Sequence, residues 1–227
     1  MHIERLDFEN SPYLGVFGVA TDKVVLVREG LQAKKLEVIR EVLKVPVVEA
    51  SIMKSRIIGI LAAGNSNAII VPWYIWDTEL ESIERKFKEL GIETEIVPFE
   101  TKYTALGNLI LANDRAALVS TKFSREEARK IGDILGVEVE RGVIAGLHAV
   151  GSAGVVTNKG GLVHPETSDE ELKWLSELFK VDVYVGTANM GVPYVGSCML
   201  ANSNGVVVGS LTTGPEIVKI EEALGLI

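Results

Sequence analysis

Few residues of this 227-residue chain could act as a nucleophile or a general base. They are a single cysteine, Cys198, and three histidines, His2, His148 and His164. Cysteine catalysis requires a thiolate, which a neighbouring base or positive charge must favour. Cys198 lies in the apolar run 196–201, which we expect to be a strand, and no histidine stands at a spacing that marks a site. A buried free cysteine behaves as a small hydrophobic residue, so we interpret Cys198 as a packing residue.

The sequence also lacks the spacings that bind metals, cofactors and phosphates. One cysteine cannot form an internal disulfide, and no pair of cysteine or histidine residues has metal-ligand spacing. Neither Gly-x4-Gly-Lys-Ser/Thr nor Gly-x-Gly-x-x-Gly occurs among the 22 glycines. We therefore expect no metal and no cofactor.

The charge of the chain limits its partners. It carries 31 acidic and 23 basic residues, a formal net charge of −8. Proteins that grip nucleic acid through phosphates normally have a basic excess, so we expect little direct nucleic-acid binding. An acidic surface suits a basic protein, including one that sits on RNA, although the charge could equally serve solubility alone.

No segment reads as a membrane span. The most apolar stretch, residues 57–76, is interrupted by the polar turn 64–67, whereas a spanning helix needs about 20 continuous apolar residues. No apolar run follows a basic start, so no secretory signal is indicated. We expect a cytoplasmic protein without a membrane partner.

A repeat of 44 to 48 residues runs along the chain. Each repeat opens with a glycine before an apolar run; these are Gly15, Gly59, Gly107, Gly151 and Gly196. A polar pair follows six and seven positions later, namely Thr21-Asp22, Asn65-Ser66, Asn113-Asp114, Thr157-Asn158 and Asn202-Ser203. Such residues favour turns through short side-chain hydrogen bonds. Because an apolar run resumes after each pair, every unit is predicted to begin with a hairpin.

A helix is predicted after every hairpin. Four of the five carry a Ser/Thr-x-x-Glu start, typical of a capping box: Thr78 with Glu81, Ser124 with Glu127, Ser168 with Glu171, and Thr213 with Glu216. Apolar residues then recur at three- and four-residue steps, which indicates one buried helix face. The first helix, about 31–43, lacks the box. A third short strand follows in four units, at 47–48, 96–97, 137–139 and 183–185.

The fifth unit has little room for its third strand, whereas residues 2–6 precede the first glycine without a unit of their own. Pairing of this segment within the fifth unit would close a ring and remove open sheet edges. We therefore expect an α/β (α+β) fold, a single domain over 1–227 built from five ββαβ units in a closed ring. The units are about 14–56, 57–104, 105–149, 150–194, and 195–227 with 1–13.

Several short strings along the chain carry a family resemblance. They are Phe8-Glu9-Asn10, Ala50-Ser51-Ile52 with Arg56-Ile57-Ile58-Gly59, Leu106-Gly107-Asn108, Asn113-Asp114 with Ala117-Leu118-Val119, and the longest, Asn158-Lys159-Gly160-Gly161-Leu162-Val163-His164-Pro165. In this order and spacing they make the chain similar to the translation initiation factor 6 family of ribosome anti-association factors. Eukaryotic relatives extend into a flexible tail, so this chain, which ends with its fifth unit, resembles the archaeal type.

The resemblance implies the pentein fold, with five ββαβ units around a pseudo-fivefold axis. It also implies a factor that binds the joining face of the large ribosomal subunit, on ribosomal proteins near the sarcin–ricin loop. There it would keep the small subunit from docking by steric occupation, as a monomer and without catalysis. Whether subunit maturation or initiation is the main role stays open.

Two other functions remain as alternatives. Some pentein relatives are guanidine-modifying enzymes with a cysteine nucleophile, so Cys198 could serve such a reaction. A generic scaffold for an unrelated protein is the second alternative.

The candidate partner-binding residues are Asn108, Arg56, Asn65, Asn113, Asp114, Asn158, Tyr13 and Tyr194. Asn108 comes first, because the resemblance implies that the corresponding asparagine lies at the ribosome interface. Turn chemistry alone could explain the residues of the polar pairs, and the tyrosines could pack within the ring. Trp73, Tyr74 and Trp76 are expected to cover the core.

Overall fold

Fifteen strands form five three-stranded sheets in residues 2–227, the part of the chain that the computed structural model describes. In each sheet two antiparallel strands make a hairpin, and a third strand runs parallel to the second. The sheets contain β2 (Gly18–Ala20), β3 (Val25–Arg28) and β4 (Val47–Ala50); β5 (Ala63–Gly64), β6 (Ala68–Pro72) and β7 (Glu95–Phe99); β8 (Ile110–Ala112), β9 (Ala116–Ser120) and β10 (Glu138–Gly142); β11 (Gly154–Val156), β12 (Gly161–Val163) and β13 (Val183–Val185); and β14 (Met199–Asn202), β15 (Gly205–Gly209) and β1 (Ile3–Leu6).

Each unit carries two kinds of helix. A long helix follows every hairpin: α1 (Ala33–Leu43), α3 (Asp77–Glu89), α5 (Arg125–Leu135), α7 (Asp169–Phe179) and α9 (Gly214–Ala223). A short helical turn precedes every hairpin: η1 (Leu14–Val16), α2 (Ile58–Leu61), α4 (Leu106–Leu109), α6 (Val150–Ala153) and α8 (Val195–Cys198). The short turns contain the repeated glycines, which the sequence had placed at the start of strands. Cys198 is accordingly the last residue of α8, and the expectation that it lies in a strand is wrong.

Three of the four predicted capping boxes are confirmed, those that begin at Ser124, Ser168 and Thr213. The box predicted at Thr78 is wrong, because α3 already begins at Asp77. There Glu79 accepts a hydrogen bond from the backbone N–H of Trp76 at 3.4 Å. Acidic side chains in the first turn favour this earlier start through the helix dipole.

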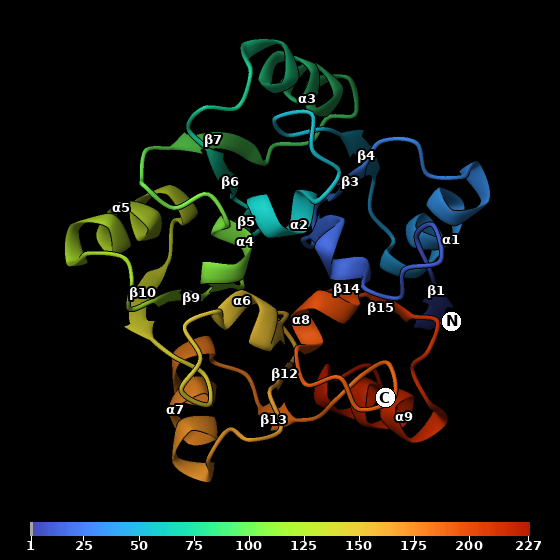
Figure 1. The fold of residues 1–227 in the computed structure, drawn as a ribbon, viewed down its shortest axis with the longest axis vertical. Helices are drawn as coiled ribbons and strands as arrows, with labels where there is room; N and C mark the ends of the chain where they lie inside the picture. Colours follow the sequence, from blue (N-terminus) through green and yellow to red (C-terminus); the bar gives the residue numbers. More distant parts are fainter. Residues whose placement is uncertain (1) are drawn as a thin grey trace.

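The five units lie around a central axis, with the short helices inside and the long helices outside (Figure 1). Within the ring, β1 pairs in parallel with β15, so that Ile3 stands opposite Val206 and Leu6 opposite Gly209. The first strand of the chain thus completes the last unit, as the sequence predicted. The arrangement is the pentein fold.

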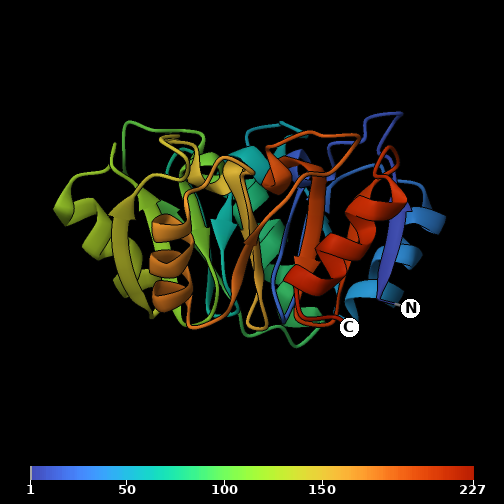
Figure 2. The same ribbon diagram turned by 90° about the horizontal axis from the view of Figure 1, so that it is seen from below.

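The ring has two faces, seen at the top and bottom of Figure 2. We call the face with the short helices, the loops before them (residues 7–13, 51–57, 101–105, 143–149 and 186–194) and the loops after the middle strands (29–32, 73–76, 121–124, 164–168 and 210–213) the turn face. We call the face with the polar hairpin tips (21–24, 65–67, 113–115, 157–160 and 202–204) the hairpin face. The first strand of each hairpin separates the two faces, because it begins after a short helix and ends at a tip.

The five repeated glycines meet at the centre of the ring. A Cβ atom on Gly59 would collide with the carbonyl oxygen of Gly15, and one on Gly107 with that of Gly59. The series continues around the ring, and a Cβ on Gly15 would strike the carbonyl oxygen of Gly196. Only a residue without a side chain permits this approach.

Five apolar cores lie between neighbouring units. Side chains alternate along each middle strand, so each strand contributes to two cores. In β3, Val25 and Val27 enter the core shared with the fifth unit, whereas Leu26 enters the core shared with the second. Among the helices of residues 2–227, none has the length and apolar character needed to cross a membrane.

Replacing a central glycine should damage the ring. In Gly107→Ala the new methyl group meets backbone atoms that cannot rotate away, so we expect a loss of about 2–3 kcal/mol or more of unfolding free energy. Gly214→Ala is the matched control, because nothing lies within 4 Å of its added Cβ. Thermal and denaturant melts of both variants measure the difference. Equal stability of the two would contradict the central packing described here.

Candidate partner-binding surface

Asparagines at the hairpin face tie neighbouring units together. Asn113 Nδ2 donates to the carbonyl oxygens of Thr157 at 3.1 Å and Phe179 at 3.0 Å. Asn65 makes the corresponding pair of bonds to Asn113 and Leu135. The two asparagines are only 3% and 4% exposed. The structure therefore places both side chains in the contacts between units.

Asp114 and Asn158 take part in the same network. Asp114 accepts from the N–H and the hydroxyl of Ser66, both at 2.8 Å. Asn158 Nδ2 donates to the carboxylates of Asp114 and Asp22, both at 2.7 Å. Asp22 also accepts from the N–H of Ser203 at 2.7 Å. These bonds join all five tips across the hairpin end of the axis.

The other four candidates lie on the turn face, at the opposite ends of the strands. Asn108 is half-buried in α4, where its Oδ1 accepts a hydrogen bond from Ser152 Oγ at 2.9 Å. Tyr13 and Tyr194 are 40% and 41% exposed. The structure thus separates the eight predicted residues into two groups that cannot form one contact surface.

Exposed apolar side chains gather on the turn face. Of the eleven large apolar residues that are exposed within residues 2–227, seven lie there: Tyr13, Met53, Trp73, Trp76, Met190, Tyr194 and Leu211. Trp73 and Trp76 follow the end of β6 and are 54% and 47% exposed, so the expectation that they cover the core is wrong. Lys54 Nζ lies 4.4 Å from the ring centre of Trp76. Clustered exposed apolar residues typically mark interaction sites.

Four loops of the turn face contain a tight turn with two consecutive residues at positive φ. The pairs are Glu9-Asn10, Met53-Lys54, Ala145-Gly146 and Asn189-Met190, the last of which continues into Gly191, also at positive φ. The left-handed conformation costs a non-glycine residue about 1–2 kcal/mol. Such turns persist only where the surroundings fix them. The sequence showed part of this signal, since Asn10, Asn189 and Gly146 tolerate positive φ.

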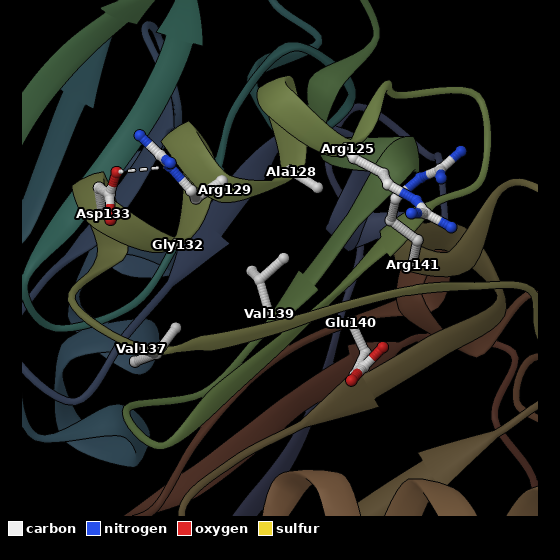
Figure 3. A pocket seen from close by; sticks show the side chains of 9 residues that line it. All are labelled: Arg125, Ala128, Arg129, Gly132, Asp133, Val137, Val139, Glu140 and Arg141. Atoms are coloured by element: carbon white, nitrogen blue, oxygen red, sulfur yellow. Dashed lines mark ion pairs between the residues drawn. The ribbon is translucent and has the colours of Figure 1, made fainter.

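A groove runs along the outer wall of the third unit, between α5 and β10 (Figure 3). It has a volume of about 560 Å³, and apolar residues such as Val137 and Val139 form part of its lining. The side chains of Arg125 and Arg141 lie together at one end. Neither a cysteine nor a histidine is among its lining residues, so the groove is separate from Cys198.

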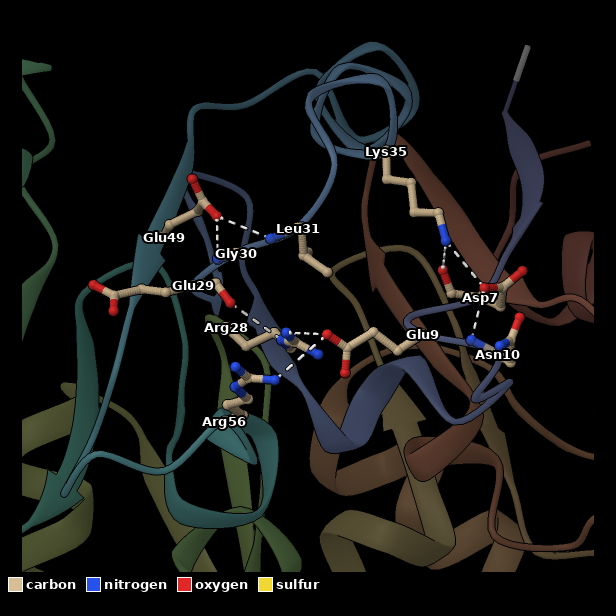
Figure 4. Close-up of polar contacts among 10 residues, drawn as sticks. All are labelled: Asp7, Glu9, Asn10, Arg28, Glu29, Gly30, Leu31, Lys35, Glu49 and Arg56. Carbon is tan, nitrogen blue, oxygen red and sulfur yellow. Dashed lines mark hydrogen bonds and ion pairs between the residues drawn. The ribbon is translucent and has the colours of Figure 1, made fainter.

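Charged residues secure the junction where the ring closes (Figure 4). Arg28, whose side chain is 1% exposed, donates to Glu9 at 2.7 Å, and this bond lowers the pKa of the Glu9 carboxyl. Arg56 also pairs with Glu9, at 3.4 Å, while its side chain stays 66% exposed. Lys35 Nζ donates to the carbonyl oxygen and the carboxylate of Asp7, at 2.7 and 3.0 Å. Arg56 thus has an internal partner yet remains accessible on the turn face.

Cys198 is not placed for nucleophilic chemistry. It is fully buried, and its Sγ donates to the carbonyl oxygen of Tyr194 at 3.4 Å. Burial raises the pKa of the thiol to about 11. His164 stacks edge-on against Tyr194, and His148 bonds Thr121. No hydrogen bond joins the thiol to a histidine within residues 2–227, and the same residues contain no acidic, cysteine and histidine cluster suited to a metal.

The fold and this surface describe a pentein ring with an exposed, partly apolar turn face. The family model described as "eIF-6 family" matches residues 3–223. The chain therefore belongs to the eIF-6 family of translation initiation factors. It is 89% identical over 227 residues to translation initiation factor 6 of Pyrococcus abyssi and 83% identical to that of Pyrococcus horikoshii, each comparison covering 100% of both chains.

A dimethylarginine dimethylaminohydrolase, solved as an adduct with S-methyl-L-thiocitrulline, gives a TM-score of 0.48 at 12% identity. That comparison covers 76% of this chain and 68% of the hydrolase. A likeness at this level carries no argument about activity.

The thiol of Cys198 should react slowly in the folded protein. With a pKa of about 11, only about one thiol in a thousand is ionised at pH 8. We expect iodoacetamide to label the folded chain at least about a hundredfold more slowly than the same chain in denaturant, because the thiolate attacks and burial blocks access. Mass spectrometry of timed samples measures both rates. Equally fast labelling would restore cysteine catalysis as an alternative.

Proposed function

We propose that this protein binds the large ribosomal subunit and prevents association with the small subunit. Membership of the eIF-6 family over residues 3–223 carries the proposal. The action is steric occupation of the joining face, so affinity and release rate set its strength. The buried Cys198, which has no histidine bonded to it, supports a role without catalysis.

The turn face is the proposed contact surface. It holds most of the exposed large apolar residues, and interfaces draw their energy from such side chains. The expected partners are basic ribosomal proteins near the sarcin–ricin loop, which the net charge of −8 suits. Direct nucleic-acid contact has a minor part, and the protein acts as a cytoplasmic monomer.

The predicted site residues divide accordingly. Asn108, Arg56, Tyr13 and Tyr194 are proposed to touch the partner, since all four lie on the turn face. The hairpin-face residues Asn65, Asn113, Asp114 and Asn158 support the ring through their bonds between units. Their effect on binding would be indirect.

Co-sedimentation with purified large subunits, followed by a subunit-joining assay, tests the function itself. The protein should pellet with large subunits and lower the yield of joined ribosomes as its concentration rises. Failure to pellet, or an unchanged yield of joined ribosomes, would remove the anti-association proposal.

A pair of charge insertions tests which face makes contact. Met190, 72% exposed, lies on the turn face, and Leu90, 53% exposed, follows the end of α3 near the hairpin face. Met190→Glu should weaken binding to large subunits by about tenfold or more, because a carboxylate is desolvated at an apolar contact. Leu90→Glu adds the same charge and should bind like the wild type. The reverse order would assign the contact to the hairpin face.

A further inference from the structure

The third residue of every long helix reaches the turn-face loop of the preceding unit. In each helix this is the position that, in a capping box, bonds back to the helix start. The five residues are Lys35, Glu79, Glu127, Glu171 and Glu216. Each therefore links two units at the turn face, and we call them the strap residues.

Glu216 makes the most complete set of bonds. Its two carboxylate oxygens accept from the N–H and hydroxyl of Thr213, at 2.7 and 2.8 Å, at the start of α9. They also accept three bonds from the loop after β13. These come from the hydroxyl of Thr187 at 2.9 Å and the N–H groups of Gly191 at 2.8 Å and Met190 at 3.2 Å. A glutamate that only capped its own helix would not accept hydrogen bonds from the loop of the preceding unit.

Glu79 holds the turn at Met53-Lys54 in the same way. It accepts from the N–H groups of both residues at 2.7 Å, and from the hydroxyl of Ser51 at 2.9 Å. Both N–H donors belong to residues at positive φ. The carboxylate therefore fixes a turn that its own residues disfavour.

The other three strap residues make the same link between units, but the groups that form the hydrogen bond differ. Glu171 accepts from the N–H of Ala145 at 3.1 Å, and Glu127 from the hydroxyl of Thr101 at 2.7 Å. At the junction of the fifth and first units the strap residue is the donor instead of the acceptor, because Lys35 Nζ donates to the carbonyl oxygen of Asp7. The link is thus present at all five junctions.

We propose that the strap residues position the turn-face loops for partner binding, so that exposed side chains such as Met53 and Met190 are already held in the bound arrangement. This rests on the proposed function, in which the turn face contacts the large subunit. Loops ordered in advance lose less conformational entropy on binding. Met190 is too exposed to be held by its own packing; Asn189 anchors one side of its loop through Thr212 and Pro12, and Glu216 accepts the N–H groups of Met190 and Gly191.

The electrostatics of Glu216 agree with this role. Burial alone would raise its pKa, but the hydrogen bonds from Thr213, Gly191 and Thr187 outweigh burial and lower the pKa to about 2. The charged form therefore dominates at neutral pH, when it can accept all five bonds. A glutamine offers only one oxygen, and its amide nitrogen faces donors rather than acceptors.

Glu216→Gln tests the proposal, with two readouts. Amide hydrogen exchange at Met190 and Gly191 should accelerate by about tenfold or more, since their acceptor is weakened or lost. Binding to purified large subunits should weaken by about tenfold. Glu222→Gln is the charge control, because this exposed residue lies on the same helix. Thr213→Ala removes only the hydroxyl that donates to Glu216 at the start of α9 and leaves the loop donors in place; it should lower the melting temperature and leave exchange at the loop unchanged.

The outcomes separate the two proposals. Unchanged exchange in Glu216→Gln would overturn the strap role, whether or not the protein binds ribosomes. Faster exchange with wild-type affinity, while Met190→Glu still binds weakly, would overturn the positioning of the contact surface and leave the proposed function standing. Wild-type binding by both Met190→Glu and Glu216→Gln would show that the turn face is not the contact surface, and would overturn both.

Discussion

The contact between successive glycines at the centre of the ring is the constraint on which the rest of the structure depends. Each glycine packs against the carbonyl oxygen of the one before it, and the series returns from Gly196 to Gly15. The approach sets the distance between units, because backbone meets backbone with no side chain to adjust. In a closed ring an increase at one contact is passed to the other four, since no free end can absorb it.

Close approach at the centre is what allows neighbouring units to share their cores. No unit contains a complete core of its own, because alternate residues of its middle strand face different neighbouring units. In β3, for example, Leu26 and Val27 belong to different cores. The last core contains Phe8 from the beginning of the chain and Val207 from its end. The ring should therefore fold cooperatively and depend on contacts between distant segments, which slow folding. An open array of repeats could instead grow from any unit.

Features that repeat along the chain could be predicted from the sequence, whereas contacts with residues far away in the chain could not. The polar pairs predicted the hairpins, and residues 2–6 predicted the closing strand, because turn chemistry and missing strands can be read locally. The short helices were missed, since three or four residues carry no helical period; Cys198 was misplaced for that reason. The second role of Glu79 was also hidden. Its donors at Met53 and Lys54 lie 26 and 25 residues earlier, and no spacing rule connects them to Glu79.

The way the turn-face loops are ordered explains why that face can stay apolar and exposed. A loop held by burying its own side chains would have none left for a partner. Here carboxylates from the adjacent helices satisfy loop N–H groups, so Met53 and Met190 are not required for local packing. Backbone order and side-chain availability come from different interactions. A protein that acts by occupying a surface needs both, because its binding energy must come from exposed groups already in place.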